Sequence, residues 1–447
     1  MDVILPEFDL NEPTWFCLSL LLILAVYFRF SRVWSLRNLD LGLLLCISPG
    51  LLLAGSSPNI GYAWLFGLTL LLLLRLFCDG LFKRRPRTEQ NLNAPGLVFL
   101  LCASFAFLTV LVITADLPDS AVETVRQGQQ LLEGEETPVA AADENTDAEQ
   151  TGPAGRLIAA PIAQAVGNVT QAGESRVAEY TSRVLAMLSH LAVVLGLLYI
   201  GYALFSELQL GIAMASLYLL LPCTAFEVGQ VVHVLPAALI LWALAFYRRP
   251  MVSGSLMGLA CGTLGFPIFL LPLWIAFYGR RGALRFAGAL AIVGAVLLAS
   301  LAWTSPDTRS FVQQTVGMFD WSVLNFQDAQ ETGFWATTLD VSYRIPMFAA
   351  FVIMLVVLTA WPRKKNLEQL MANCTAVVVG TQFLYPEPGG VYLLWYLPLL
   401  LAVVFRPRLA QYGAPEFLQK GNQEQQAPQP AKPELAVSGH ASGQLFR

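Results

Sequence analysis

Charge is scarce in this sequence. Only 13% of its 447 residues are Asp, Glu, Lys or Arg, whereas 56% are hydrophobic and the mean hydropathy is +0.58. A soluble domain usually carries about 25% charged residues. Apolar runs such as 18–28, 68–74 and 98–113 lie in segments long enough to cross a bilayer. The composition therefore predicts an all-α polytopic bundle of helices embedded in the lipid bilayer.

Several chemical signatures are also missing. The sequence has no P-loop, no GxGxxG fingerprint and no HExxH motif, so we expect neither a cofactor nor a bound metal. Its seven cysteines lie in or beside apolar runs without any CxxC pair, which predicts buried free thiols. Carboxylates are almost absent from the apolar spans, and this argues against an ion-coupled transporter. Nothing in the sequence favours nucleic-acid binding.

Basic residues divide unevenly between the two ends of the expected spans. Arg29, Arg32 and Arg37 follow the first span, and the run Lys83-Arg84-Arg85-Pro86-Arg87 follows the third. Lys and Arg are enriched in the cytoplasmic turns of membrane proteins. The asymmetry predicts about 13 crossings of the cell membrane, including a pair of short helices, with the N-terminus outside and the C-terminus in the cytoplasm.

The chain is expected to divide into three parts. Residues 1–94 would form a three-span N-terminal segment, and residues 95–410 a membrane core with external loops at 116–182 and 304–343. The Gln-, Pro- and Ala-rich residues 411–447 have the composition of a disordered cytoplasmic tail.

The first external loop is acidic, and its middle, Pro138–Gly155, has a composition typical of disorder. Before it, Ser120 and Glu123 have the spacing of a capping box and Gly134 marks a helix stop. This pattern predicts a helix lying in the membrane interface.

A few polar side chains inside the spans are expected to be structural. Arg75 and Asp79 are four residues apart near the end of a span, which predicts a local ion pair. His190, within the expected span 183–205, is predicted to hydrogen-bond to another helix.

The middle of the chain carries the most informative pattern. An apolar span ends at Arg248-Arg249-Pro250, and a stretch rich in small residues then leads to a break at Pro267 and a second apolar run closed by Arg280-Arg281. The roughly 30 residues between the two basic pairs are too few for two full spans. We expect two short helices, 251–264 and 266–278, that enter the membrane and return, packed closely through their glycines.

This order of features resembles the middle of the GT-C membrane glycosyltransferases, within which it is most similar to the bacterial polyprenyl-phosphate-dependent mannosyltransferase-like proteins. The features are a Pro, then Gly229-Gln230, an apolar span, Arg248-Arg249 and a small-residue helix that ends near Phe266-Pro267. The resemblance covers Thr114 to Phe405. It implies transfer of a sugar from a polyprenyl-phosphate donor to an acceptor at the outer face of the membrane.

Asp119 is the first catalytic candidate. The resemblance implies an aspartate where the chain enters the first external loop, followed by an interfacial helix and a glycine, as Gly134 follows here. Such a carboxylate can accept the proton of an acceptor hydroxyl that attacks the sugar. Asp116 is the fallback. The alternative is a structural role, in which Asp119 is an acid favoured at a helix N-terminus by the helix dipole. Glu123, which stands where relatives often have a Tyr, favours that alternative.

Arg344 is the main candidate for binding the lipid phosphate. It stands where the chain re-enters the membrane after the second external loop, and a guanidinium can bind a phosphate through two hydrogen bonds. The alternative is an interfacial arginine whose head reaches toward water. Arg126 is a weaker candidate for the same role.

Three further residues are candidates for binding the sugars. Glu227 and His233 flank Gly229-Gln230, and a His near a span end can orient an acceptor or can be an ordinary interfacial residue. Glu387 opens the last span. The aromatic residues after it suit sugar stacking as well as a plain interfacial belt, and they are Tyr392, Trp395 and Tyr396.

Two rival functions remain open. Many relatives carry a Lys just before the Pro of the small-residue helix, whereas this chain has Thr263-Leu264-Gly265-Phe266 before Pro267. That departure favours a non-catalytic relative that binds a lipid-linked sugar or scaffolds a partner. A transporter or flippase would use the prolines of the middle region as helix breaks along a path, but the sequence shows no inverted halves.

The charge asymmetry gives a direct test of topology. Single cysteines introduced at Asp147 and Gln425 of a cysteine-free variant should react with an impermeant thiol reagent from opposite sides of the membrane. Labelling of both positions from the same side would contradict the orientation.

Overall fold

The computed structural model describes residues 12–81, 90–133, 152–171, 173–305, 307–317, 334–337, 341–385 and 392–415. Over these ranges the chain forms helices joined by short turns, and the single β-bridge joins Asn366 and Gly413. The expected all-α membrane bundle is confirmed. The tail beyond residue 415 and the loop residues 134–151 lie outside the described ranges.

The described residues up to Thr114 form five α-helices. The expected span 39–55 is in fact two helices that meet at Cys46, and the next two helices match the expected spans. Gly61 lies against the preceding helix so closely that an added Cβ would be 2.2 Å from the backbone nitrogen of Ala54. The five are α1 (Glu12–Tyr27), α2 (Leu36–Leu45), α3 (Ile47–Ser56), α4 (Pro58–Phe77) and α5 (Ala94–Thr114).

In its described part, the expected first external loop contains two complete helices, α6 (Asp119–Glu133) and α7 (Pro153–Thr170). The sequence pattern predicted α6 but not α7, although the proline at the first helical position of α7 is a helix-start signal. After α7 comes α8 (Glu174–Tyr199), which continues into a π-helical turn at Ile200–Leu204.

The middle of the chain corrects one expectation about the two short helices. Helix α12 (Pro250–Thr263) is followed by α13 (Leu271–Thr304), which kinks at Gly279 with φ 63°. A Cβ added at Gly254 would lie 2.3 Å from the carbonyl oxygen of Phe286. The small-residue face of α12 therefore packs on the part of α13 beyond the kink, and not on its returning partner 266–278.

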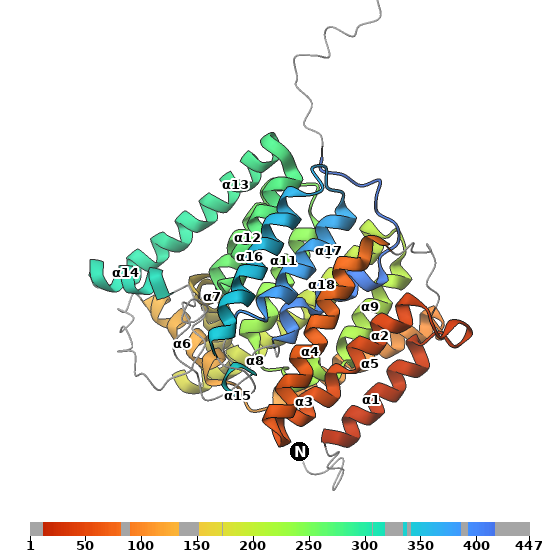
Figure 1. Cartoon of the computed structure of the whole chain (residues 1–447). Helices are drawn as coiled ribbons and strands as arrows, with labels where there is room; N and C mark the ends of the chain where they lie inside the picture. Colours follow the sequence, from red (N-terminus) through yellow and green to blue (C-terminus); the bar gives the residue numbers. More distant parts are fainter. Residues whose placement is uncertain are drawn as a thin grey trace, which may run out of the picture. The chain divides into compact units, whose positions relative to one another are not determined.

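Three helices lie at the centre of the bundle, with α1 to α5 on one flank and α13 on the other (Figure 1). They are α11 (Val231–Ala245), α17 (Leu367–Thr381) and α18 (Leu393–Phe405). Every residue of α18 is buried. The remaining helices are α9 (Leu208–Leu220), α10 (Pro222–Phe226), α14 (Thr308–Gly317), α15 (Phe334–Thr337) and α16 (Arg344–Ala360).

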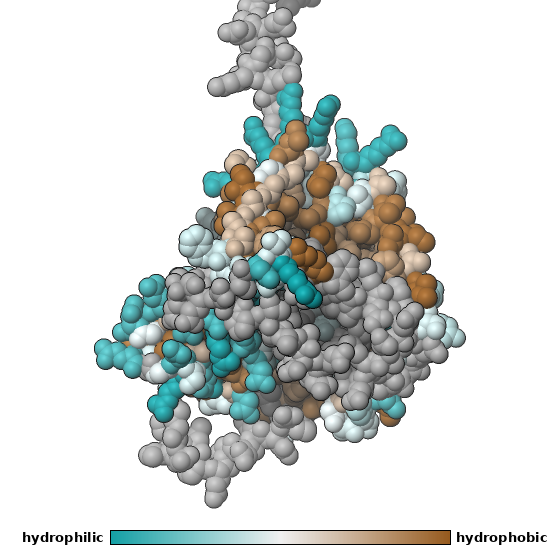
Figure 2. Space-filling model, turned by 90° about the vertical axis from the view of Figure 1, so that its left-hand side faces the viewer, coloured by the Kyte–Doolittle hydropathy of each residue, from teal (hydrophilic) through white to brown (hydrophobic). Residues whose placement is uncertain are grey.

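The surface is that of a protein surrounded by lipid. Among the described residues, five helical segments are long and apolar enough to cross a membrane. Large apolar side chains are exposed along them, and Figure 2 shows an apolar band below an end where hydrophilic side chains gather. All described cysteines are free, as expected, but only Cys223 and Cys374 are buried and Cys261 is partly buried. The expectation of burial is wrong for the four exposed ones, because helices in lipid expose apolar faces. These four are Cys17, Cys46, Cys78 and Cys102.

The central helices are too short to cross the bilayer alone. Helix α18 has 13 residues and α11 has 15, which gives lengths of about 20 and 22 Å against a hydrocarbon core of about 30 Å. The turns at one end of these helices therefore lie at membrane depth. Such backbone is tolerated only where it is buried in protein or lines an aqueous cavity.

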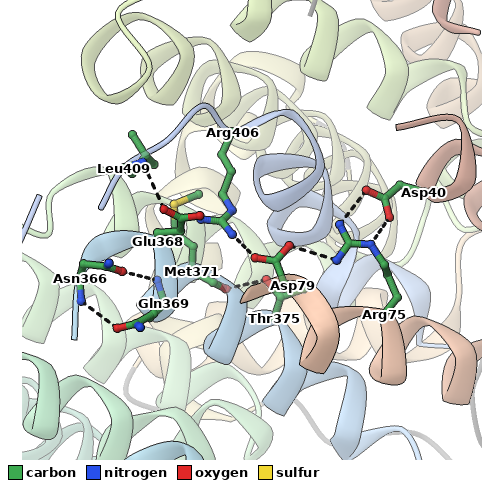
Figure 3. Close-up of polar contacts among 10 residues, drawn as sticks. All are labelled: Asp40, Arg75, Asp79, Asn366, Glu368, Gln369, Met371, Thr375, Arg406 and Leu409. Carbon is green, nitrogen blue, oxygen red and sulfur yellow. Dashed lines mark hydrogen bonds and ion pairs between the residues drawn. The ribbon is translucent and has the colours of Figure 1, made fainter. Parts of the chain in front are cut away.

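A chain of buried charges joins the N-terminal flank to the central helices α17 and α18 (Figure 3). The guanidinium of Arg75 binds Asp40 through Nε at 2.5 Å and Asp79 through Nη1 at 3.0 Å. Asp79 also accepts from Arg406, which pairs with Glu368 at 2.6 Å. The local Arg75–Asp79 pair is confirmed, but it is one link of a longer network. We call the end of the bundle that carries Arg75, Arg406 and Arg248 the basic end.

Removal of Asp79 should destabilise the fold more than removal of any other residue of the network, because Asp79 neutralises two buried arginines. We expect Asp79→Ala to lower the free energy of unfolding by about 3–5 kcal/mol, the usual cost of breaking a buried ion pair. Thermal unfolding in detergent measures the change. The matched control is Glu179→Ala, which removes a half-exposed acid paired to Arg183 at 2.9 Å and should cost under about 1 kcal/mol. Equal losses would contradict a structural role for the network.

Candidate functional site

The site is built where two loops meet at the end opposite the basic end. The segment between α5 and α6 lies against the loop between α10 and α11. An added Cβ at Gly229 would be 3.2 Å from Cδ of Pro118, so the two loops are in close contact there. The two loops line an open pocket of about 370 Å³. Its polar lining residues are Thr114, Asp116, Glu227 and Gln230, and we call it the acidic pocket.

A buried histidine holds the second of these loops. Nε2 of His190 lies 3.1 Å from the carbonyl oxygen of Val228, and Nδ1 lies 2.9 Å from the hydroxyl of Tyr218. A carbonyl can only accept, so Nε2 carries the proton and, in the neutral ring, Nδ1 accepts from the Tyr218 hydroxyl. The predicted role of His190 as a group that bonds helices together is confirmed, and the loop it fixes lines the acidic pocket.

The two aspartates are placed differently. Asp116 is exposed and lines the acidic pocket, whereas Asp119 is the exposed first residue of α6. The expected capping box is wrong, because α6 begins one residue before Ser120. The carboxylate of Glu123 instead accepts from Arg126 at 2.9 Å and from Gln127 at 3.0 Å.

Helix α6 is anchored, and this fixes the position of Asp119. Ala121 and Val125 are buried, and an added Cβ at Gly128 would lie 2.8 Å from the carbonyl oxygen of Arg156. The first turns of α6 and α7 also meet α11 and the end of α12, because Ala121, Gly155, Val231 and Thr263 line one small cavity.

Arg156 is a cation where α6 and α7 pack together, and it was not among the candidates from the sequence. It lies in the first turn of α7 and is partly buried, and its Nε has no hydrogen-bond partner among the described residues. Burial lowers the pKa of the Arg156 guanidinium, while the charge of Glu123 acts to raise it. The guanidinium stays charged at neutral pH. The signal that could have found it is the helix start Gly152-Pro153 just before it.

An aromatic cluster forms the next part of the site. His233, in the first turn of α11, is 7% exposed, and its ring centroid lies 5.1 Å from that of Tyr392 and 5.8 Å from that of Trp395. Trp395 is stacked between Tyr392 and Phe266, each at 4.3 Å. Tyr392 and Trp395 are buried, so the alternative of a lipid-facing aromatic belt does not fit them.

Arg344 reaches the same cluster from α16. It is 2% exposed, and its Nη2 donates a hydrogen bond of 2.9 Å to the carbonyl oxygen of Leu384. The next residue, Tyr385, has its ring 5.7 Å from that of Tyr392. Arg344 therefore points into the protein, and the alternative of an arginine that reaches toward water does not fit.

The structure does not bring every candidate together. Arg126 is exposed and forms an ion pair with Glu123, and no described contact joins it to Asp119 or Arg344. Glu387 lies outside the described residues. Within the described ranges no group of three or more His, Cys, Asp or Glu side chains is placed to hold a metal.

The comparisons with known proteins give one match. Residues 153–386, more than half of the chain, match the family model described as glycosyltransferase family 87. The matched region contains Arg156, Glu227, His233 and Arg344, and excludes both aspartates. No curated protein and no solved structure matches the chain. The apolar helices and this match together show that the chain belongs to glycosyltransferase family 87, as a membrane protein.

Proposed function

We propose that the protein transfers a sugar from a polyprenyl-phosphate donor to an acceptor at the outer face of the membrane, as the GT-C-like resemblance implies. The observation that carries the proposal is the recessed polar site itself. Acidic, aromatic and cationic side chains gather there at the end of helices that are otherwise apolar. A lipid-linked sugar needs such a polar site, because its tail stays in the lipid while its polar head must leave the lipid.

The site faces outward in this proposal. Helix α18 begins beside the aromatic cluster and ends at Arg406 in the charge network, so the site and the basic end lie at opposite ends of one helix. Basic ends of membrane proteins face the cytoplasm. The acidic pocket would then open on the external side.

Arg344 and Arg156 are the proposed phosphate-binding residues. Relatives often place a Lys just before the Pro corresponding to Pro267, a region where Phe266 here stacks on Trp395. Arg344 reaches the same aromatic cluster through Leu384 and Tyr385 and can supply the missing cation. A partly desolvated guanidinium binds a phosphate through two charge-assisted hydrogen bonds.

The chemistry requires a proton acceptor. The acceptor hydroxyl oxygen attacks the anomeric carbon, the bond from that carbon to the phosphate oxygen breaks, polyprenyl phosphate leaves, and the hydroxyl proton passes to a carboxylate. We propose Asp119 or Asp116 as that carboxylate. Asp119 has the position that the resemblance implies, while Asp116 shares the acidic pocket with Glu227. Glu227 and His233 would orient the acceptor sugar.

Replacing each aspartate by asparagine separates the two candidates. The volume is kept and both side chains are exposed, so both variants should fold. The variant that lacks the base should lose about 10²–10⁴-fold in transfer rate, the usual contribution of acid–base assistance. The assay uses purified protein in liposomes with polyprenyl-phosphate sugars, and Asp307→Asn, an exposed acid at the start of α14, is the control. Full activity in both variants would remove these residues from the mechanism.

A second experiment tests the phosphate site. We expect Arg344→Gln to raise the KM for the lipid donor by roughly 10- to 100-fold, as loss of a hydrogen bond to a charged group predicts. Arg344→Lys keeps the charge and should have an intermediate KM. This variant still tests the assignment if the Gln variant does not fold. Arg126→Gln removes an exposed arginine and should leave KM unchanged. An unchanged KM in both Arg344 variants would contradict the assignment.

A non-catalytic relative is the second candidate. The absence of the family lysine before Pro267 favours it. In that case the wild-type protein would bind a polyprenyl-phosphate sugar without either transferring or hydrolysing it.

A further inference from the structure

A second pocket lies at the basic end, away from the proposed active site. The π-helical turn at Ile200–Leu204 and the end of α11 enclose a hollow of about 220 Å³. Its lining includes Tyr199, Phe246, Arg248 and Arg249, and we call it the arginine pocket. No acidic side chain lines it in the part of the chain that the structure describes.

The hollow arises where two helices diverge. Helices α8 and α11 pack closely at Gly196, where an added Cβ would be 2.9 Å from a methyl group of Leu241, and the indole of Trp242 donates to the carbonyl oxygen of Ala192 at 2.9 Å. The π turn then adds a residue to the helical repeat. Ser206, with φ 56°, turns the chain toward α9. A space remains between the two helix ends.

One of its arginines is held in place. Nε of Arg248 donates to the hydroxyl of Tyr247 at 3.0 Å, and the guanidinium lies over the rings of Tyr247 at 5.7 Å and Tyr412 at 5.4 Å. The hydrogen bond to Tyr247 raises the pKa of the Arg248 guanidinium, which is therefore a permanent cation. Arg249 precedes the first residue of α12, Pro250, whose helix places its positive end there.

The surroundings of the pocket are apolar and face lipid. Leu188, Leu195 and Tyr202 are exposed at seven-residue intervals along α8 and the π turn, so they share a stripe of the helix surface that leads to the pocket. The floor is aromatic, with the ring of Tyr199 5.5 Å from Trp242 and 5.4 Å from Phe246. An amphipathic molecule with an anionic head and an apolar tail matches this arrangement.

We propose that the arginine pocket binds the phosphate headgroup of an anionic phospholipid from the membrane leaflet at the basic end. Basic pockets between membrane helices are suited to such headgroups. The two arginines hold the phosphate, the aromatic floor lies under the glycerol region, and the acyl chains follow the exposed stripe on α8. This site is distinct from the acidic pocket, because α11 begins at one and ends at the other.

The test measures lipid retained by the full-length protein. Purified protein is placed in nanodiscs of phosphatidylcholine with increasing phosphatidylglycerol, and bound lipid is counted by native mass spectrometry. We expect saturable binding of phosphatidylglycerol, weakened roughly 10- to 30-fold in Arg248→Gln/Arg249→Gln, from the contribution of two basic residues near a charged membrane surface. The variant Arg248→Lys/Arg249→Lys keeps both charges and should bind within a few-fold of wild type.

The control removes two cations from the same end outside the pocket. Arg363 and Lys364 are exposed and do not line the hollow, so Arg363→Gln/Lys364→Gln should retain full binding. An equal loss in this control would overturn the proposal, because surface charge alone would then explain the binding. Inorganic phosphate should not displace the lipid. Displacement at millimolar concentration would show a site for soluble anions and would also overturn the assignment to a lipid.

Discussion

The chain of ion pairs from Asp40 to Glu368 is the constraint on which the bundle depends. Inside lipid, apolar helices gain no hydrophobic free energy by associating, while an unpaired buried charge is strongly unfavourable. The network ties α2 and α4 to α17 and α18 through side chains that are at most 5% exposed, apart from the outermost acid. The network thereby holds the two central helices against the N-terminal segment. That segment lies outside the region that matches the family.

The positions of α17 and α18 decide the shape of the site. The basic end of each is held by the network, and the other ends carry Tyr385, Tyr392 and Trp395. These three aromatic residues are buried in protein at the ends of the two short helices. The same shortness of α11 brings His233 and the loop held by His190 to that depth. Charge pairing at one end and a polar site at the other are two consequences of one packing arrangement.

Sequence reasoning succeeded where the signal was local. Apolar runs predicted α4 and α5 closely, and the helical spacing of Arg75 and Asp79 predicted their ion pair. It failed where partners are distant in the chain. The glycines of α12 were expected to contact the returning helix, but helix packing placed them on the far half of α13. Helix α7 and its Arg156 were missed, although Pro153 at the first helical position is a local signal for a helix start.

By itself the sequence determined that this is a helical membrane protein, with a basic and an opposite end, and with a central pattern similar to membrane glycosyltransferases. Hydropathy and charge act on each span separately, so local composition is sufficient for these conclusions. Only the tertiary structure decided that Asp116 shares a pocket with Glu227, that Arg344 points inward, and that Arg406 completes the network begun at Asp40. Those contacts join residues up to hundreds of positions apart, and they depend on how side chains of different helices pack together.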